Sequence, residues 1–171
     1  MRMFMNDYSE GACPQIMDAL LATNGEQCVG YTEGDPHCER ARELIRTACG
    51  RDDVDVEFCI GGTSPAADGL TLEHIARRCS AFYLGGTKNG MLMGEAMVIV
   101  DPKLKAAFPY VQKERCGLLA KGRLLGVQFE TAFTQPADGG EALYWQLARS
   151  ANNCALKLRD GMVGLGFEPY R

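Results

Sequence analysis

Apolar residues recur at helical spacing in several segments of the chain. Residues 14–23 open with a proline and place apolar side chains three to four positions apart, which predicts an amphipathic helix. A second helix is predicted to begin after Asp35, an N-cap residue, and to stop at Gly50. Helical periodicity also marks residues 71–78, 101–133 (with interruptions near Pro109 and Gly117) and 141–159.

Alternation of apolar and polar residues predicts β-strands elsewhere. Residues 54–60 alternate in this way and run into a Gly-Gly-Thr sequence. Residues 81–84 are a short apolar run that ends at a second Gly-Gly-Thr, residues 95–100 form another strand, and residues 161–171 begin a further one. Strands that alternate with helices indicate an α/β fold with a largely parallel sheet, here of about three strands.

Composition narrows the class of protein. The 171 residues are 46% hydrophobic and 23% charged, as in soluble globular domains, and the formal net charge is -4. The acidic balance argues against a general nucleic-acid binder, and the longest apolar runs are too short to cross a membrane. The N-terminal residues lack the apolar core of a signal peptide, so a cytoplasmic location is expected.

Cysteine is abundant, but its spacing indicates no disulfide framework. The eight cysteines are spread evenly with no Cys-x-x-Cys pair, and the two histidines show no zinc-site spacing. We therefore predict eight reduced thiols and no metal site.

Three motifs could carry chemistry. Gly61-Gly62-Thr63 after a strand could cradle a phosphate, although a lone motif of this kind is more often a plain turn. Lys88, between two glycine-containing pairs beyond a strand, could form a Schiff base with an aldehyde cofactor; an exposed hairpin lysine is the alternative. A basic cluster, which could meet an anion or be a solvated helix face, comprises Lys113, Arg115, Lys121 and Arg123.

Five blocks of the chain together resemble the threonine aldolases. They read NDYSEGACP, GYTEGDPHCERA, VEFCIGGT, LTLEHIARRCSAFYLGGTKNGMLMGEAMVI and RCGLLAKGRLLGVQFE. Their order matches the threonine aldolase branch of the β-eliminating lyases, within the aminotransferase-like enzymes that use pyridoxal 5'-phosphate (PLP). The block that contains GGTKNG is the most specific of them.

The resemblance implies a cofactor site and a substrate site. The matching cofactor positions are Lys88 for the Schiff base, Gly61, Gly62 and Thr63 for the phosphate, and a basic residue near that phosphate, for which Lys113 matches best, beside Arg115 and Arg123. The matching substrate positions are Ser9, with Asn6 and Asp7 beside it, and Tyr31 in a loop that lines the site from a neighbouring subunit.

The sequence also departs from the family's pattern. After Thr63 the chain passes directly to a segment that in the family follows the ring-pairing aspartate and a substrate-binding arginine, so an internal deletion is expected at 63/64. Residues 1–135 would then be a partial PLP-binding large domain, and 136–171 the start of a truncated small domain. We expect the sheet edge that the missing strands would pair to be exposed and sticky.

By resemblance, the expected activity is retro-aldol cleavage of β-hydroxy-α-amino acids, such as threonine to glycine and acetaldehyde. The substrate would be a small amino acid, and the chain would form a homo-oligomer. One alternative is a catalytically inactive remnant or interaction domain of the same family. Another is a phosphate-binding module that uses only Gly61–Thr63 and the basic cluster.

Overall fold

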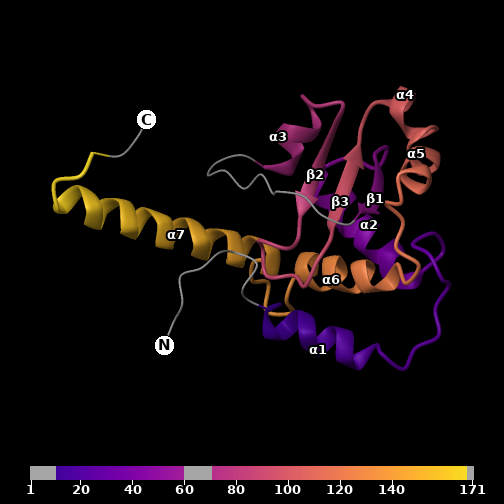
Figure 1. Ribbon diagram of the computed structural model, residues 1–171, viewed down its shortest axis with the longest axis horizontal. Helices are drawn as coiled ribbons and strands as arrows, with labels where there is room; N and C mark the ends of the chain where they lie inside the picture. The colour runs from indigo at the N-terminus through magenta and orange to yellow at the C-terminus, as the bar shows by residue number, and fades with distance from the viewer. Residues whose placement is uncertain (1–10, 60–70, 169–171) are drawn as a thin grey trace.

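The computed structural model describes residues 11–59 and 71–168 as one sheet with helices around it (Figure 1). The sheet has three strands in the order β1-β3-β2. Its strands are β1 (Asp55–Cys59), β2 (Ala81–Gly85) and β3 (Glu95–Ile99). The helices are α1 (Pro14–Ala22), α2 (Pro36–Cys49), α3 (Leu72–Ala76), α4 (Pro102–Lys105), α5 (Phe108–Glu114), α6 (Arg123–Phe133) and α7 (Leu143–Gly164).

The mixed α/β class is confirmed, but the prediction of a largely parallel sheet is wrong. Strand β3 lies between β1 and β2 and pairs antiparallel with each of them. Strands β1 and β2 run in the same direction, as a crossover through α3 requires, yet they are not neighbours. Hydrophobic alternation shows which face of a strand is buried and does not show which strand lies beside it.

The core lies on one face of the sheet, against α2 and α6. Alternate residues of the three strands are buried there, paired across the sheet as Val56 with Val98 and Phe58 with Ala96. Helices α2 and α6 cross closely beneath them (Figure 1). A Cβ at Gly126 would lie 2.5 Å from the backbone nitrogen of Cys38, so this crossing requires glycine.

Local capping signals place the helix ends where the sequence predicts them. Asp35 accepts a hydrogen bond from the Cys38 backbone N–H at 2.9 Å and caps α2. Gly50 ends that helix in the left-handed region, at φ 61°. The expected long helical region divides into α4, α5 and α6, with breaks on either side of α5. The strand expected from residue 161 is contradicted as far as Gly164, because α7 continues to that residue.

The outer edge of β1 is covered by side chains, whereas the expectation of an exposed edge where the missing strands would pair stays a prediction. Side chains from two helices donate hydrogen bonds to its carbonyls: Arg46 Nε to Val54 at 3.0 Å, and Arg42 Nε to Val56 at 2.9 Å. Gln112 Nε2 donates to Phe58 O at 2.8 Å. These donors occupy the acceptors that another strand would use, which is one way in which proteins blunt sheet edges.

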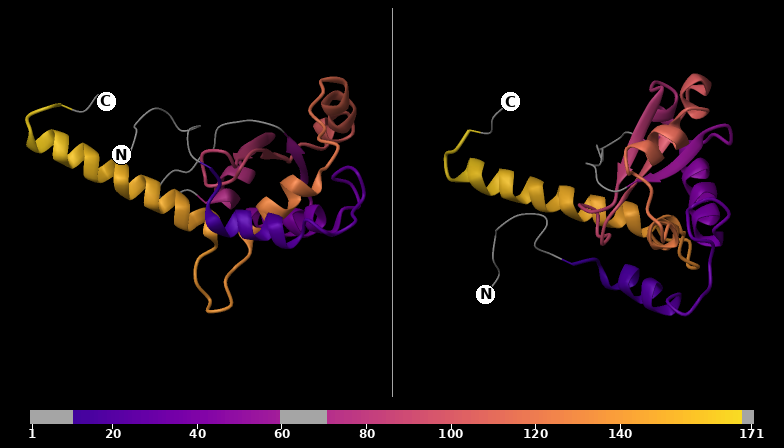
Figure 2. Two further views of the ribbon diagram at one scale, coloured as in Figure 1. Left: turned by 60° about the horizontal axis from the view of Figure 1, so that its bottom comes forward. Right: turned by 45° about the vertical axis from the view of Figure 1, so that its right-hand side comes forward.

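Helix α7 packs against the body only at its start. Its 22 residues span about 33 Å, and most of that length projects away from the sheet (Figure 2). Tyr144 and Ala148 are its buried residues, whereas Leu158 and Met162 are exposed. The proposed division of the chain into 1–135 and 136–171 stays a prediction. Within the described part of the chain, no helix is long and apolar enough to span a membrane.

Candidate functional site

Strands β1 and β2, which lead into the two Gly-Gly-Thr motifs, have their carboxyl ends at the same side of the sheet. We call this side the Lys88 edge, to distinguish it from the lateral edges of the outer strands. Cys59 of β1 and Gly85 of β2 both pair with Glu95 at the start of β3, from its two sides. Since neighbouring strands lie about 4.8 Å apart, the ends of β1 and β2 are separated by about 10 Å. Strands β1 and β2 therefore end at one side of the sheet. Gly61, Gly62 and Thr63 themselves lie outside the described residues.

Lys88 lies in a tight turn at this edge. The Asn89 N–H donates to Gly86 O at 2.8 Å, and the Gly86 N–H donates to Gly94 O at 2.9 Å. Gly90 has φ +83°, and a Cβ there would also lie 2.5 Å from Leu147, so this turn requires glycine. Lys88 is an exposed residue of this turn.

Two helices hold the Lys88 turn in place. The Asn89 side chain, itself buried, donates to Tyr144 O at 3.0 Å, and the Tyr144 hydroxyl donates to Gly85 O at 3.4 Å. From the other side, the backbone N–H of Cys13 donates to Gly90 O at 2.8 Å. The residues just before α1 therefore lead to the Lys88 turn. Ser9, Asn6 and Asp7, the predicted substrate contacts, lie outside the described residues.

Glu95 was not singled out by the sequence, although it begins β3 between the two strand ends. Its Oε2 is buried without a hydrogen-bond partner among the described residues, and burial raises the pKa of this carboxyl. Cys59 of β1 pairs with Glu95. Burial and then the carboxylates of Glu95 and Glu57 raise the pKa of the Cys59 thiol to about 11. The sequence signal that could have identified Glu95 is its position as a charged residue at the start of a largely apolar strand.

Other predicted residues meet in a cavity of about 690 Å³ beside the outer edge of β1. Tyr31 and Lys113 both line it, so the structure brings these two predicted residues together. Charges of both signs surround them, because Arg42, Arg46 and Glu57 also line the cavity. Lys88 is not among its lining residues.

The two remaining basic residues have different surroundings. Arg115 is exposed at the end of α5. Arg123 donates to the backbone carbonyls of Thr23, Asn24 and Glu26, in the loop between α1 and α2. Neither lines the cavity that contains Lys113. Their assignment to a cofactor phosphate stays a prediction. The hydrogen bonds of Arg123 stabilise the loop between α1 and α2.

Comparison with known proteins supports the fold. No family model matches the chain, and no curated protein matches its sequence. Among solved structures, it is similar to the threonine aldolase of Leishmania major, with a TM-score of 0.84. The match covers 96% of this chain and 80% of that protein's chain, at 24% identity. The chain thus has the fold of a threonine aldolase, and at this identity the likeness shows the fold alone.

Proposed function

We propose that this protein binds PLP through Lys88 and belongs functionally to the threonine-aldolase group. The observation that carries the proposal is the position of Lys88: a fixed turn, at the sheet edge where β1 and β2 both end. Amine groups at such positions can be held by the fold while they reach a ligand. The similarity of the fold to a threonine aldolase agrees with this assignment.

The residues at this edge fit part of what PLP requires. Lys88 would hold the cofactor aldehyde, and the Oε2 of Glu95, which has no partner within the described part of the chain, offers an acceptor for an N–H group of the ligand. When bound, PLP supplies an electron sink for charge that develops on an amino-acid substrate. The segment Gly61–Thr63, which follows the end of β1 in the sequence, would bind the phosphate. The proposed reaction is cleavage of β-hydroxy-α-amino acids, such as threonine.

A second candidate is a non-catalytic member of the same fold, and one observation favours it. A ring-pairing aspartate belongs near the lysine, but the described aspartates in or within two residues of a strand, which are Asp53, Asp55 and Asp101, lie at the opposite end of the sheet. Among the described acidic residues, Glu95 is the one placed to take that role, and burial raises its pKa. A chain of this kind could bind PLP without cleaving threonine.

The two candidates are separated by a binding test followed by an activity test. PLP added to the intact protein should produce a new visible absorption band, and borohydride reduction with peptide mapping should locate the label on Lys88. Lys88→Arg should abolish the band, whereas Lys121→Arg, at an exposed lysine, should leave it. A label spread over Lys103, Lys105 and Lys121 would contradict the proposal. Acetaldehyde release from threonine then identifies an enzyme, and its absence with specific labelling identifies the non-catalytic candidate.

A further inference from the structure

A second cluster of chemically capable side chains lies away from the Lys88 edge. Glu26 and Cys28, in the loop between α1 and α2, meet His37 in the first turn of α2. One potential ligand atom from each of the three lies within 4.8 Å of the others. His37 Nε2 and Glu26 Oε2 lie 2.9 Å apart. A carboxylate, a thiol and an imidazole gathered at this distance are a set that divalent metals bind.

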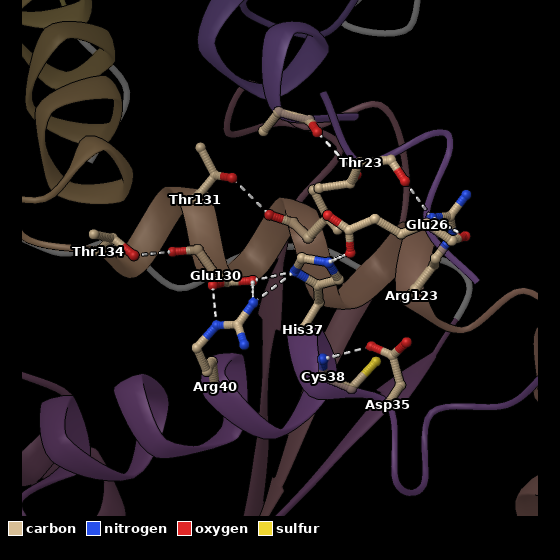
Figure 3. A network of polar contacts seen from close by, with 12 residues as sticks. Thr23, Glu26, Asp35, His37, Cys38, Arg40, Arg123, Glu130, Thr131 and Thr134 are labelled. Atoms are coloured by element: carbon tan, nitrogen blue, oxygen red, sulfur yellow. Dashed lines mark hydrogen bonds and ion pairs between the residues drawn. The ribbon is translucent and has the colours of Figure 1, made fainter. Parts of the chain in front are cut away.

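The imidazole is already oriented for coordination. Glu130 of α6 contacts His37 Nδ1 at 2.6 Å through Oε2, and Arg40 pairs with the same carboxylate (Figure 3). Without a metal, Nε2 donates its proton to Glu26 at 2.9 Å. A metal ion that binds Nε2 would displace this proton and leave Nδ1–H to donate to Glu130. Metal-binding histidines usually carry a carboxylate on the second ring nitrogen in this way, since it fixes the ring and strengthens the ligand.

The loop that carries the other two groups is held in place. Arg123 donates to the carbonyls of Thr23, Asn24 and Glu26, and Figure 3 shows this guanidinium beside the backbone at Glu26. The loop therefore needs little reordering to present Glu26 and Cys28. Arg123 also places a positive charge near the Cys28 thiol, and this charge opposes a bound cation.

A buried carboxylate next to the thiol adds negative charge to the cluster. Asp35 is 0% exposed, and its Oδ1 accepts from Cys38 N. Its Oδ2 has no hydrogen-bond partner among the described residues. Burial raises the pKa of the Cys28 thiol, and a side-chain hydrogen bond to Asp35 and then the charge of Asp35 raise it further, so Asp35 lies beside that thiol. A buried carboxylate oxygen without a partner is costly unless a cation or a water bound to it completes the site.

We propose that Glu26, Cys28 and His37 bind a zinc ion, with Glu130 orienting His37 and Asp35 adding negative charge. Zinc is favoured because a thiolate, an imidazole and a carboxylate are all its common ligands, and three protein ligands leave one tetrahedral position for water. The ion would replace the direct contact between His37 and Glu26. It would join the α1–α2 loop to α2, at a site separate from Lys88.

The test uses the full chain with the three exposed thiols removed as Cys79→Ser, Cys116→Ser and Cys154→Ser, so that they cannot bind metal. Titration with Co²⁺ alone should give one equivalent of binding and a thiolate-to-cobalt charge-transfer band. Zn²⁺ should displace the cobalt. Cys28→Ser should remove the band, and Glu130→Gln should weaken binding by about 10- to 100-fold, as expected when a group that orients a ligand is lost.

His74→Asn is the matched control, because His74 is an exposed histidine outside the cluster. It should leave metal affinity unchanged, whereas His37→Asn should lower it by more than Glu130→Gln does. The thermal midpoint of each folded variant provides a second readout, since Zn²⁺ should raise it only where the three ligands are intact. Absence of one-equivalent binding would overturn the proposal. A charge-transfer band that survives Cys28→Ser would also overturn the proposal. In either case, His37 would serve only to bridge Glu26 and Glu130.

Discussion

We expect substitution of Arg42 to lower the free energy of unfolding strongly. Its side chain is buried, with 7% of the residue exposed, and it joins three parts of the molecule. It donates to Val56 O at 2.9 Å, to Thr32 O at 3.1 Å and to Glu39 Oε1 at 2.6 Å. Its guanidinium also lies 5.5 Å from the centre of the Phe58 ring and 3.7 Å from Glu57.

Arg42→Met keeps much of the apolar bulk and removes the charge and the donors. The carbonyls of Val56 and Thr32 lose their donor, and the half-buried Glu57 loses its nearest cation. Removing one member of a buried ion pair costs about 3–5 kcal/mol, and we expect a loss of free energy of unfolding in that range. This is a large share of the about 5–15 kcal/mol that stabilises a typical domain. Arg77→Met, at an exposed i,i+4 pair with Glu73, should cost less than about 1 kcal/mol.

The loss of free energy of unfolding in Arg42→Met should also depend on pH, because Glu57 titrates. Burial raises the pKa of Glu57, and Arg42 opposes this increase. A carboxyl with a raised folded-state pKa favours folding below its unfolded pKa, and this contribution is lost as pH rises through the folded value. Without Arg42 that pKa should rise further, so Arg42→Met should cost more at about pH 8 than at about pH 5.

Urea unfolding of the single variants and of Arg42→Met with Glu57→Gln measures these terms as a double-mutant cycle. The added Glu57→Gln change should recover part of the loss at the higher pH, because it removes the unpaired charge. A cost for Arg42→Met below about 1 kcal/mol would refute the reasoning, since the guanidinium would then contribute no more than an exposed ion pair. A cost that is equal at both pH values and unaffected by Glu57→Gln would refute the role of Glu57.

Three further predictions follow from burial and exposure. All eight thiols should titrate in the unfolded, unreduced protein; in the folded protein Cys79, Cys116 and Cys154 should react first, and buried Cys49, with a pKa raised by burial to about 11, should react slowly. Recovery of two or more disulfides would contradict this. Light scattering over a dilution series should find a discrete dimer, because Leu158, Val163 and other side chains of α7 are exposed; polydisperse growth would instead indicate pairing through a sheet edge, and a stable monomer at tens of micromolar would refute both. Hydrogen exchange should be faster for the amides of residues 152–164 than for those of residues 147–149, since an isolated helical segment is marginal in water; equal protection would show that the outer part of α7 is covered.

Local signals in the sequence predicted the elements well, and they did so for identifiable reasons. Asp35 and Gly50 mark the two ends of α2 through a side-chain acceptor and a left-handed backbone, both of which are properties of single residues. The alternation in β1 reflects burial of one face and needs no knowledge of neighbours. The order of the strands could not be read in this way, because β3 inserts between β1 and β2 through long-range pairing.

The candidate sites differ in the same way: one is marked by residues close together in the sequence, and the other is assembled from distant ones. Lys88 stands out in the sequence because the glycines that shape its turn are adjacent to it. The His37 cluster does not, since its hydrogen-bonded partners Glu26 and Glu130 are 11 and 93 residues away. Similarly, the guanidinium of Arg123 was grouped with basic neighbours in sequence, whereas the fold directs it to the loop near Glu26. Only tertiary structure assembles such groups.

The attachment of the Lys88 turn to α7 makes the two regions energetically linked. Asn89 reaches Tyr144 O, and the Tyr144 hydroxyl reaches Gly85 O, so undocking α7 would release the turn on both sides of Lys88. If docking of α7 raises the affinity of a ligand held at Lys88 by some factor, that ligand must favour docking of α7 by the same factor. Occupancy at Lys88 would therefore be communicated along a projecting helix, to a surface far from the ligand itself.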